Sequence, residues 1–211
     1  NKIFFLPQWV DSNQISNENI EVKYPVLGKN SFKITFAGNI GSAQDIESVV
    51  KAIEFSEPNK EIHWIFIGDG SQIGILRDYI NKNNSNNVHL LGSYSKKYMN
   101  YFYNKTDALL ISLKPSKAFD PVLPAKLQSY MYSGKPILTM ASGEVSKVVK
   151  NFNIGLIANS GDFKQLSLNI KSMISFDQKR KNLIKENSFK SLNDYFDRKK
   201  LITKIEEISF S

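Results

Sequence analysis

The segment from Pro124 to Leu138 constrains the fold more than any other part of the sequence, because it joins a short helix to a buried strand. Proline is tolerated in a first helical turn, where its missing N–H would have no partner. Gly134 suits the left-handed residue that closes a helix, and Pro136 prevents the helix from continuing. The segment therefore predicts a helix that begins near Pro124, ends at Gly134 and leads directly into a strand.

Lys126 lies in the first turn of this predicted helix. Leu127, Tyr130 and Met131 fall at i, i+3 and i+4 and form a stripe for the core, whereas Lys126 and Ser129 share another face. Unpaired N–H groups and the helix dipole favour an anion in the first turn, and Lys126 adds a full positive charge there. This pattern indicates a phosphate site, and the alternative is a solvated helix lysine.

Strands and helices alternate along the rest of the chain. Helices of this length between strands require parallel pairing through right-handed crossovers, which predicts an α/β fold with a Rossmann-like, doubly wound parallel sheet of about six strands. Ligands of such sheets bind beyond the carboxyl ends of the strands. The expected strands are 32–38, 62–67, 88–92, 107–113, 136–140 and 154–157, and the expected helices begin near 43, 72, 95, 124, 143 and 162.

Three regions divide the chain. Residues 1–30 combine a short apolar piece with an Asn- and Ser-rich stretch and predict a linker that arrives from another part of a protein. Residues 31–176 form the predicted α/β domain. Residues 177–211 predict two charged helices, which pack on this domain or on a part that precedes the linker.

Charge and composition exclude some classes of site. The formal charge is +8, but the 28 Lys and Arg residues are scattered, so nucleic acid, an anionic membrane surface and a phosphorylated small molecule all stay open. The absence of cysteine excludes disulfides and thiol catalysis. His63 and His89 lie in apolar runs and predict packing roles. No apolar run reaches the roughly 20 residues of a membrane span, and we expect no signal peptide.

Two glycine-containing loops at the strand ends are candidates for ligand contact. Gly38, Asn39 and Gly41 follow the first strand, where glycines let the backbone approach a ligand closely. Their spacing is not that of a dinucleotide fingerprint, and a tight turn without ligand is an equal alternative. The loop from Gly68 to Gly70 is interpreted as a turn.

Two later loops carry polar or aromatic side chains. Gly92, Ser93 and Tyr94 follow the third strand and offer a ring and backbone amides to a nucleotide base. The loop before the Pro124 helix contributes Lys117 and Asp120, and it is too long and polar for a simple connection.

Five segments together make the sequence similar to a known family. They resemble, in order, the carboxyl-terminal half of retaining GT-B glycosyltransferases, and most closely the bacterial branch that builds capsule, O-antigen and related surface polysaccharides. The segments are Phe36 to Gln44, Ile65 to Gly70, Val88 to Gly92, Asp107 to Ser112 and Pro124 to Ile137.

The resemblance implies a function for each region. Residues 31–176 would bind a nucleoside diphosphate sugar, with a UDP-sugar favoured, and 1–30 would join them to a missing amino-terminal half that binds a glycan or lipid-linked acceptor. Such enzymes usually need no metal, and neither a cofactor nor a nucleic acid partner is implied. The implied location is the cytoplasm, with peripheral contact at the inner membrane face left open. This half alone is expected to bind nucleotide but to transfer little or no sugar.

One departure from the family pattern concerns two glutamates eight positions apart. Ser129 stands at the second position and Pro121 at the first, with Asp120 adjacent, and Glu144 is a candidate substitute or a simple helix-start glutamate. No catalytic residue is assigned. The predicted donor-binding residues are Gly38, Asn39, Gly41, Gly92, Ser93, Tyr94, Lys117, Asp120, Lys126, Gln128, Ser129 and Glu144.

Two other classes of function remain open. A different GT-B enzyme, such as a sugar-nucleotide epimerase, would need acid and base residues that the sequence does not show. A non-catalytic binding module would have lost the site together with the glutamates. The Lys- and Tyr-rich stretch from Ser95 to Tyr103 fits either contact with acidic lipid or a solvated helix face.

Overall fold

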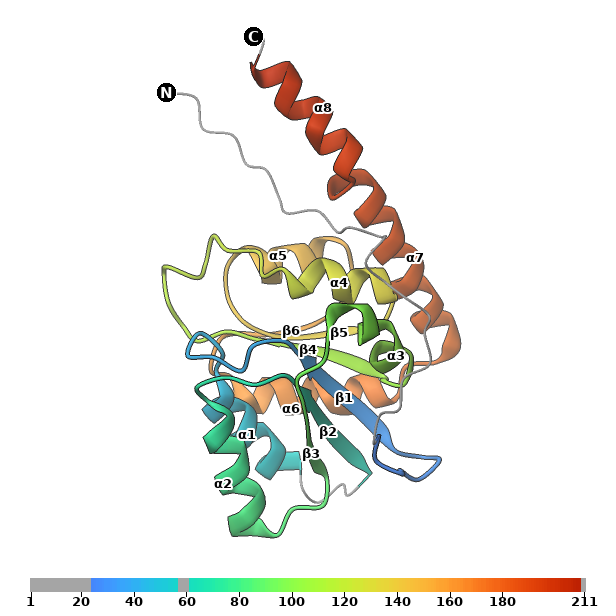
Figure 1. Ribbon diagram of the computed structural model, residues 1–211. Helices are drawn as coiled ribbons and strands as arrows, with labels where there is room; N and C mark the ends of the chain where they lie inside the picture. The colour runs from blue at the N-terminus through green and yellow to red at the C-terminus, as the bar shows by residue number, and fades with distance from the viewer. Residues whose placement is uncertain (1–23, 57–60, 210–211) are drawn as a thin grey trace.

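The computed structural model describes residues 24–56 and 61–209, so most of the expected linker in residues 1–30 lies outside the described residues. Its centre is a six-stranded sheet (Figure 1). The strands are almost continuously apolar and buried, as expected when helices cover both faces of a parallel sheet. They are β1 (Phe32–Ala37), β2 (Ile62–Ile67), β3 (Val88–Gly92), β4 (Ala108–Ser112), β5 (Ile137–Met140) and β6 (Gly155–Ala158).

The strand order is β3-β2-β1-β4-β5-β6, and the strand pairs are parallel. The chain winds outward in one direction from β1 to β3 and in the other from β4 to β6. β1 and β4 are therefore the central neighbours at which the winding direction reverses. The predicted doubly wound parallel sheet of six strands is confirmed.

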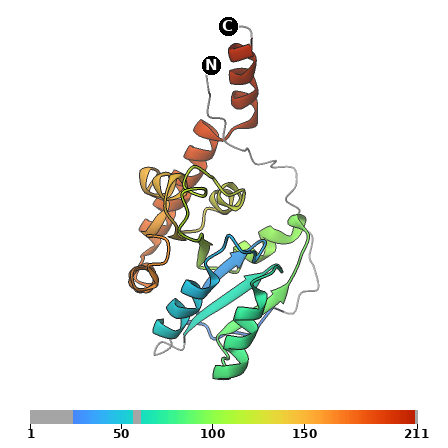
Figure 2. The same ribbon diagram turned by 90° about the vertical axis from the view of Figure 1, so that its left-hand side faces the viewer.

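Helices cover the two faces of the sheet in separate groups (Figures 1 and 2). α1, α2 and α6 pack on one face, and α3, α4, α5 and α7 pack on the other. The helices are α1 (Ile46–Ser56), α2 (Ile73–Asn83), α3 (Met99–Asn104), α4 (Lys126–Ser133), α5 (Glu144–Asn151), α6 (Phe163–Ile174), α7 (Gln178–Tyr195) and α8 (Arg198–Ser209).

Some predicted helix boundaries are wrong by a few residues, and local hydrogen bonds explain why. α1 starts at Ile46 rather than near Ala43, because the Asp45 carboxylate accepts the Ser48 N–H at 3.3 Å and caps the helix there. The stretch predicted as one helix from Ser95 divides into a 3₁₀ turn, η2 (Lys96–Tyr98), and α3.

The helix at the centre of the sequence analysis is confirmed as α4. Gly134 closes it with a φ of +66°, in the left-handed region that favours glycine. The helix begins two residues later than Pro124, whose carbonyl accepts the Leu127 N–H at 2.9 Å.

The predicted pair of charged helices at the end of the chain is also confirmed. α7 packs against α4, and Phe196, between α7 and α8, is buried in the core on that face. α8 then extends away from the layered body (Figures 1 and 2). None of the described helices has the length and apolar character needed to cross a membrane.

Candidate functional site

The loops after β1 and β4 meet at the point where the winding direction reverses. The Lys114 N–H donates to the Ala43 carbonyl at 2.9 Å, and the Ser112 hydroxyl donates to the Asp45 carbonyl at 3.3 Å. Both loops lie at the left in Figure 1, on the side where the parallel strands end. This is the place at which open α/β sheets bind ligands.

A buried tyrosine fixes α4 to the end of β1. The Tyr130 hydroxyl accepts the Ala37 N–H at 2.9 Å and donates to the Ala37 carbonyl at 3.2 Å. Its side chain has no exposed surface. Because Tyr130 and Lys126 are one helical turn apart, this anchor holds the first turn of α4 beside the loop that follows β1.

The Lys126 side chain reaches from α4 to that loop. Its Nζ donates to Gln44 Oε1 at 3.2 Å and lies 3.6 Å from the centroid of the Phe36 ring. Gly38 lies against the lysine, since a Cβ there would stand 3.6 Å from Nζ, which is van der Waals contact, and its φ of +131° is what favours glycine at this position. A predicted binding residue from α4 and one from the β1 loop are thus brought together.

The Lys126 ammonium has no opposite charge beside it. In the part of the chain that the structure describes, no carboxylate forms an ion pair with it. Burial lowers the pKa of Lys126 from 10.5 to about 7, and no neighbouring carboxylate of the described residues opposes this shift. Such a group is stabilised by any anion that enters the site.

The amino-terminal turn of α4 has no side-chain cap. By contrast, Asp162 caps α6 by accepting the Gln165 N–H at 2.9 Å, and Asp177 caps α7 by accepting the Arg180 N–H at 2.7 Å. The α4 turn and Lys126 together therefore form a positive region without a carboxylate, which suits a phosphate group.

The loop from Gly68 to Gly70 supports the loop after β1. The Ile40 N–H donates to the Asp69 carbonyl at 2.9 Å, and a Cβ on Gly68 would lie 2.0 Å from the Gly38 carbonyl oxygen. These backbone contacts agree with the interpretation of Gly68 to Gly70 as a turn that shapes the site without facing a ligand.

The loop after β3 lies on the same edge of the sheet. Gly92 and Ser93 are exposed, and Gly92 has a φ of +78°. The Tyr94 ring packs on Phe102 of α3 with 4.8 Å between centroids. Tyr94 is therefore held in place by α3, at the outer end of the strand order.

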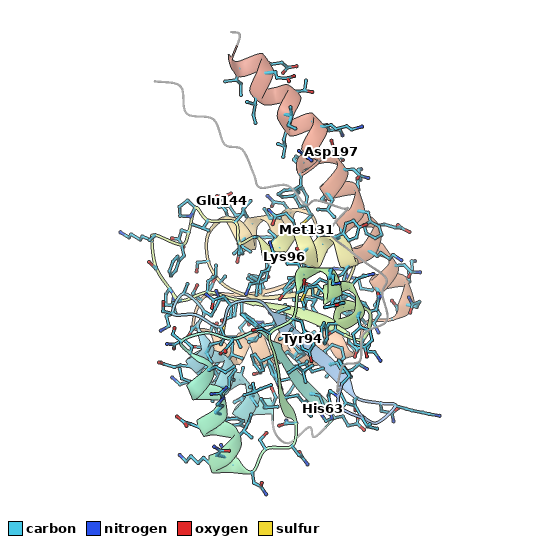
Figure 3. The ribbon with its side chains drawn as sticks, in the orientation of Figure 1. His63, Tyr94, Lys96, Met131, Glu144 and Asp197 are labelled. Carbon is cyan, nitrogen blue, oxygen red and sulfur yellow. The ribbon has the colours of Figure 1, made fainter. Side chains whose placement is uncertain are left out.

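Two predicted residues, Asp120 and Glu144, meet at the start of α5, and Lys117 belongs to the same loop as Asp120. Lys117 is exposed, and the Asp120 carbonyl accepts the Glu144 N–H at 2.7 Å. The Glu144 carboxylate pairs with Lys147 at 2.6 Å, which gives it the character of a helix-start glutamate with a partner on its own helix. Figure 3 shows Glu144 and Tyr94 well apart.

The remaining predicted residues differ in exposure. Asn39 is exposed and Gly41 is buried in the same loop. Ser129 is half-buried on α4, whereas the Gln128 side chain is only 1% exposed and belongs to the interior of the domain.

Sequence reasoning did not select Gln44 and Phe36, which both contact the Lys126 ammonium. Gln44 lies three residues after Gly41 in the same loop, and a polar side chain so close to a candidate glycine loop was the available signal. Phe36 looks like any core residue of a strand, and only the tertiary structure brings α4 over its ring.

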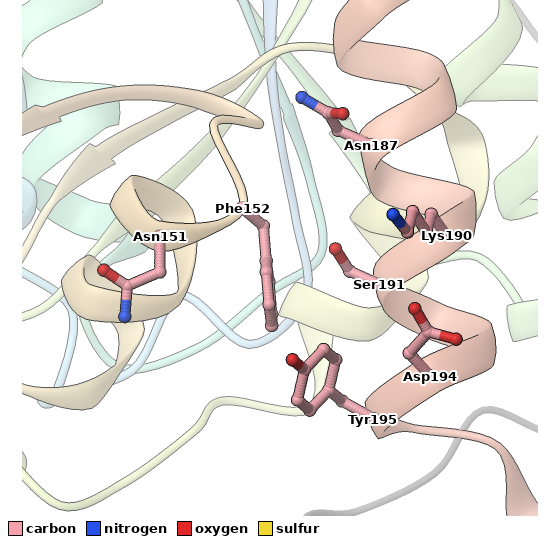
Figure 4. Close-up of a pocket in the computed structure, with 7 residues that line it drawn as sticks. All are labelled: Asn151, Phe152, Asn187, Lys190, Ser191, Asp194 and Tyr195. Atoms are coloured by element: carbon pink, nitrogen blue, oxygen red, sulfur yellow. The ribbon is translucent and has the colours of Figure 1, made fainter.

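A cavity lies away from the loops at the strand ends (Figure 4). This cavity of about 480 Å³ lies between the last residues of α5 and the second half of α7. α5 ends where β6 begins, so the cavity opens on the opposite edge of the sheet from the loops that meet at Lys126. It is lined by Asn151, Phe152, Asn187, Lys190, Ser191, Asp194 and Tyr195.

The two histidines contact each other in the sheet layer. Their rings stack with 5.3 Å between centroids, and His63 Nδ1 is 3.0 Å from His89 Nε2, which agrees with the predicted packing roles. Within residues 24–56 and 61–209, no three His, Asp or Glu side chains gather as a metal site.

Comparison with known proteins gives one family match. The family model described as "Glycosyl transferases group 1" matches residues 18–189. A curated relative, the probable glycosyltransferase WbjE of Pseudomonas aeruginosa, is 27% identical over 130 residues, which is 61% of this chain and 32% of the relative.

Solved structures have the same fold. Anabaena Alr3699/HepE, crystallised with UDP and glucose, superimposes with a TM-score of 0.71 and 18% identity over 86% of this chain and 49% of that one. Sucrose-phosphate synthase of Thermosynechococcus elongatus gives a TM-score of 0.74 and 15% identity over 97% and 51%. The chain thus spans about a third of its curated relative and about half of each solved structure.

Proposed function

The chain belongs to the glycosyl transferases group 1 family, and from this membership we propose that it is the donor-binding part of a glycosyltransferase. The donor is a nucleoside diphosphate sugar, with a UDP-sugar first. The acceptor is a growing bacterial surface glycan, and the configuration of the sugar is retained. Acceptor binding belongs to an amino-terminal half, since the chain spans only 49% of the structure that was solved with UDP and glucose.

The single observation that carries the proposal is the position of the Lys126 ammonium. It lies in the first turn of an uncapped helix, against Gly38, at the point where the winding of the sheet reverses. A diphosphate bound there would meet a full positive charge and the helix dipole together. The UDP found in the HepE crystals is a ligand of this chemical class.

The proposed contribution of this half to catalysis is electrostatic. As the bond between sugar and diphosphate breaks, negative charge grows on the diphosphate, and Lys126 with the α4 amides stabilises it. Lys117, exposed on the loop before α4, is a second candidate for this role. We propose that these groups act without a metal, so that transfer by the full-length enzyme is unaffected by EDTA.

Removal of the Lys126 charge tests the proposal. Lys126→Ala should weaken UDP binding by about 1.5–3 kcal/mol, which is roughly 10- to 150-fold, because a charge-assisted contact is lost. Isothermal titration calorimetry with UDP, GDP and ADP measures this effect and also ranks the bases.

A matched control is Lys171→Ala. Lys171 also lies over a phenyl ring, with its Nζ 6.0 Å from the Phe55 centroid, but it belongs to the last turn of α6. Its loss should leave UDP affinity unchanged. If both variants bind UDP as the wild-type chain does, Lys126 is not the phosphate ligand.

A further inference from the structure

The amide of Gln44 is the polar partner that the structure gives to the Lys126 ammonium. Gln44 is 9% exposed. Its backbone N–H donates to the Gly41 carbonyl at 3.0 Å, so the side chain extends from a hydrogen-bonded turn. A neutral amide can orient an ammonium group but cannot neutralise it.

The carboxylates on the two neighbouring loops each accept a backbone N–H, and among the described residues neither forms an ion pair with Lys126. On the β1 loop, the Asp45 carboxylate caps α1 through the Ser48 N–H. On the β2 loop, the Asp69 carboxylate accepts the Gly70 N–H at 2.7 Å.

Toward β4 and α5, no carboxylate of the described residues forms an ion pair with Lys126. The Glu144 carboxylate pairs with Lys147, which Asp120 also attracts, and the nearby loop adds the cations Lys114 and Lys117. The face of the Phe36 ring lies 3.6 Å from Lys126 Nζ, and its quadrupole attracts the ammonium without neutralising it. Burial nevertheless lowers the pKa of Lys126 to about 7, so above this pH the empty site holds mostly the neutral amine, whereas a bound anion favours the ammonium.

We propose that Gln44 is a positioning residue that holds the Lys126 amine over the Phe36 ring, and that a nucleoside diphosphate binds there together with one proton taken from solvent. The inference rests on the proposed function, because it concerns the same site. The proton adds to the lone pair of Lys126 Nζ, and the diphosphate oxygens take the place of Gln44 as its main partner.

The wild-type chain of 211 residues is sufficient for the first test. Calorimetric titration of UDP at pH 8, in HEPES and in Tris, gives the number of protons bound from the dependence of the observed enthalpy on buffer ionisation. Because the pKa of Lys126 in the empty site is about 7, the number of protons taken up on UDP binding at pH 8 should approach one. UDP affinity should fall about tenfold for each pH unit above the pKa.

Lys126→Arg is the matched control for the proton. Arginine stays charged at every pH used, so this variant should bind UDP with no proton uptake and with a flat pH profile. Any proton taken up by the bound phosphate, rather than by residue 126, would also be measured with this variant. Its proton count is therefore subtracted from that of the wild-type chain.

Two variants of Gln44 test its positioning role. Gln44→Glu should pair with the amine and keep it charged in the empty site, which abolishes proton uptake and weakens UDP binding at least about tenfold by repulsion of the phosphates. Gln44→Met keeps the volume, so uptake should persist while affinity falls severalfold. A purely structural role would instead lower the melting temperature of both variants and leave the proton count of Gln44→Glu at the wild-type value.

The outcomes separate the two proposals. If UDP binds the wild-type chain without proton uptake, or if Lys126→Arg takes up as many protons as the wild-type chain, this inference is wrong and the donor-binding function stands. If none of UDP, GDP and ADP binds, the proposed function fails and takes the inference with it.

Discussion

At the scale of single residues, Lys126 shows a conflict between stability and binding. The ammonium is partly removed from water without a carboxylate partner, and this burial lowers its pKa from 10.5 to about 7. A buried amine of this kind destabilises the empty protein, and it is retained where a ligand uses its charge.

Lys126→Met should therefore stabilise the empty protein. Because the folded-state pKa is lowered, the unfolded chain binds more protons between about pH 7 and 10.5, so wild-type stability rises with pH in this window. Methionine removes the free-energy cost of burying a charge at this position. We expect a gain of about 1–3 kcal/mol in the free energy of unfolding at pH 7.

Urea unfolding at pH 7 and pH 9 measures this difference. The gain should be smaller at pH 9, and Lys171→Met, on the surface of α6, should change neither value. A Lys126→Met protein that is less stable than wild type at pH 7 would show that the ammonium is well accommodated in the empty site.

The His63–His89 pair predicts a second pH dependence, at acid pH. Burial first and the neighbouring His63 second lower the pKa of His89 from 6.5 to about 4, and burial and Lys33 lower that of His63. Between pH 6.5 and 4 the unfolded chain takes up protons that the folded chain does not, so stability falls as the pH falls. His89→Gln should lose about 1–2 kcal/mol less than wild type between pH 7 and 4.5, as thermal unfolding would show. Equal losses in the two proteins would exclude this role.

At the scale of elements, the joint between α4 and β1 determines the site. α4 is short and has no side-chain cap, so its position depends on tertiary contacts more than on its own helical tendency. The Tyr130 hydroxyl bonds both the N–H and the carbonyl of Ala37, which is the last residue of β1.

Tyr130→Phe should loosen this joint. The Ala37 N–H and carbonyl would be left buried without their partner, and we expect a loss of about 1–3 kcal/mol in the free energy of unfolding. UDP affinity should fall as well, because Lys126 lies one turn away. Tyr132→Phe, on the exposed side of the same helix, is the control and should stay within about 0.5 kcal/mol of wild type in urea unfolding.

At the scale of the whole molecule, the described residues form one layered domain with the loops around Lys126 at the end of the sheet where the strands end. The chain spans about half of the solved structures that share its fold. α8 extends away from the domain, and its described residues include a partly exposed Ile202. We expect the amino-terminal half of the full-length enzyme to face the loops around Lys126.

The 211-residue chain should therefore bind UDP without transferring sugar. Incubation with a radiolabelled UDP-sugar and acceptor should give no product from this chain, whereas the full-length enzyme should give product with retained configuration. Transfer by the chain alone would contradict the division of labour between the halves.

The architecture could be predicted from the order and composition of the segments alone. Apolar runs such as Ile62–Ile67, separated by helices of amphipathic spacing, allow only a parallel sheet, and Gly134 with Pro136 marks the end of α4. These signals are local, so they can be read without knowing which segments meet. The first-turn position of Lys126 was predicted on the same basis.

The surroundings of Lys126 could not be predicted in this way, because they come from contacts between segments that are distant in the chain. Gln44 and Phe36 are distant from Lys126 in sequence, and their contact with the ammonium depends on the order of β1 and β4 in the sheet. The burial of Gln128, which lies on α4 with Lys126 but faces the interior, likewise could not be predicted from its position in the sequence. The charge state of a lysine depends on the groups that replace its water, and those groups come from segments that the fold brings together.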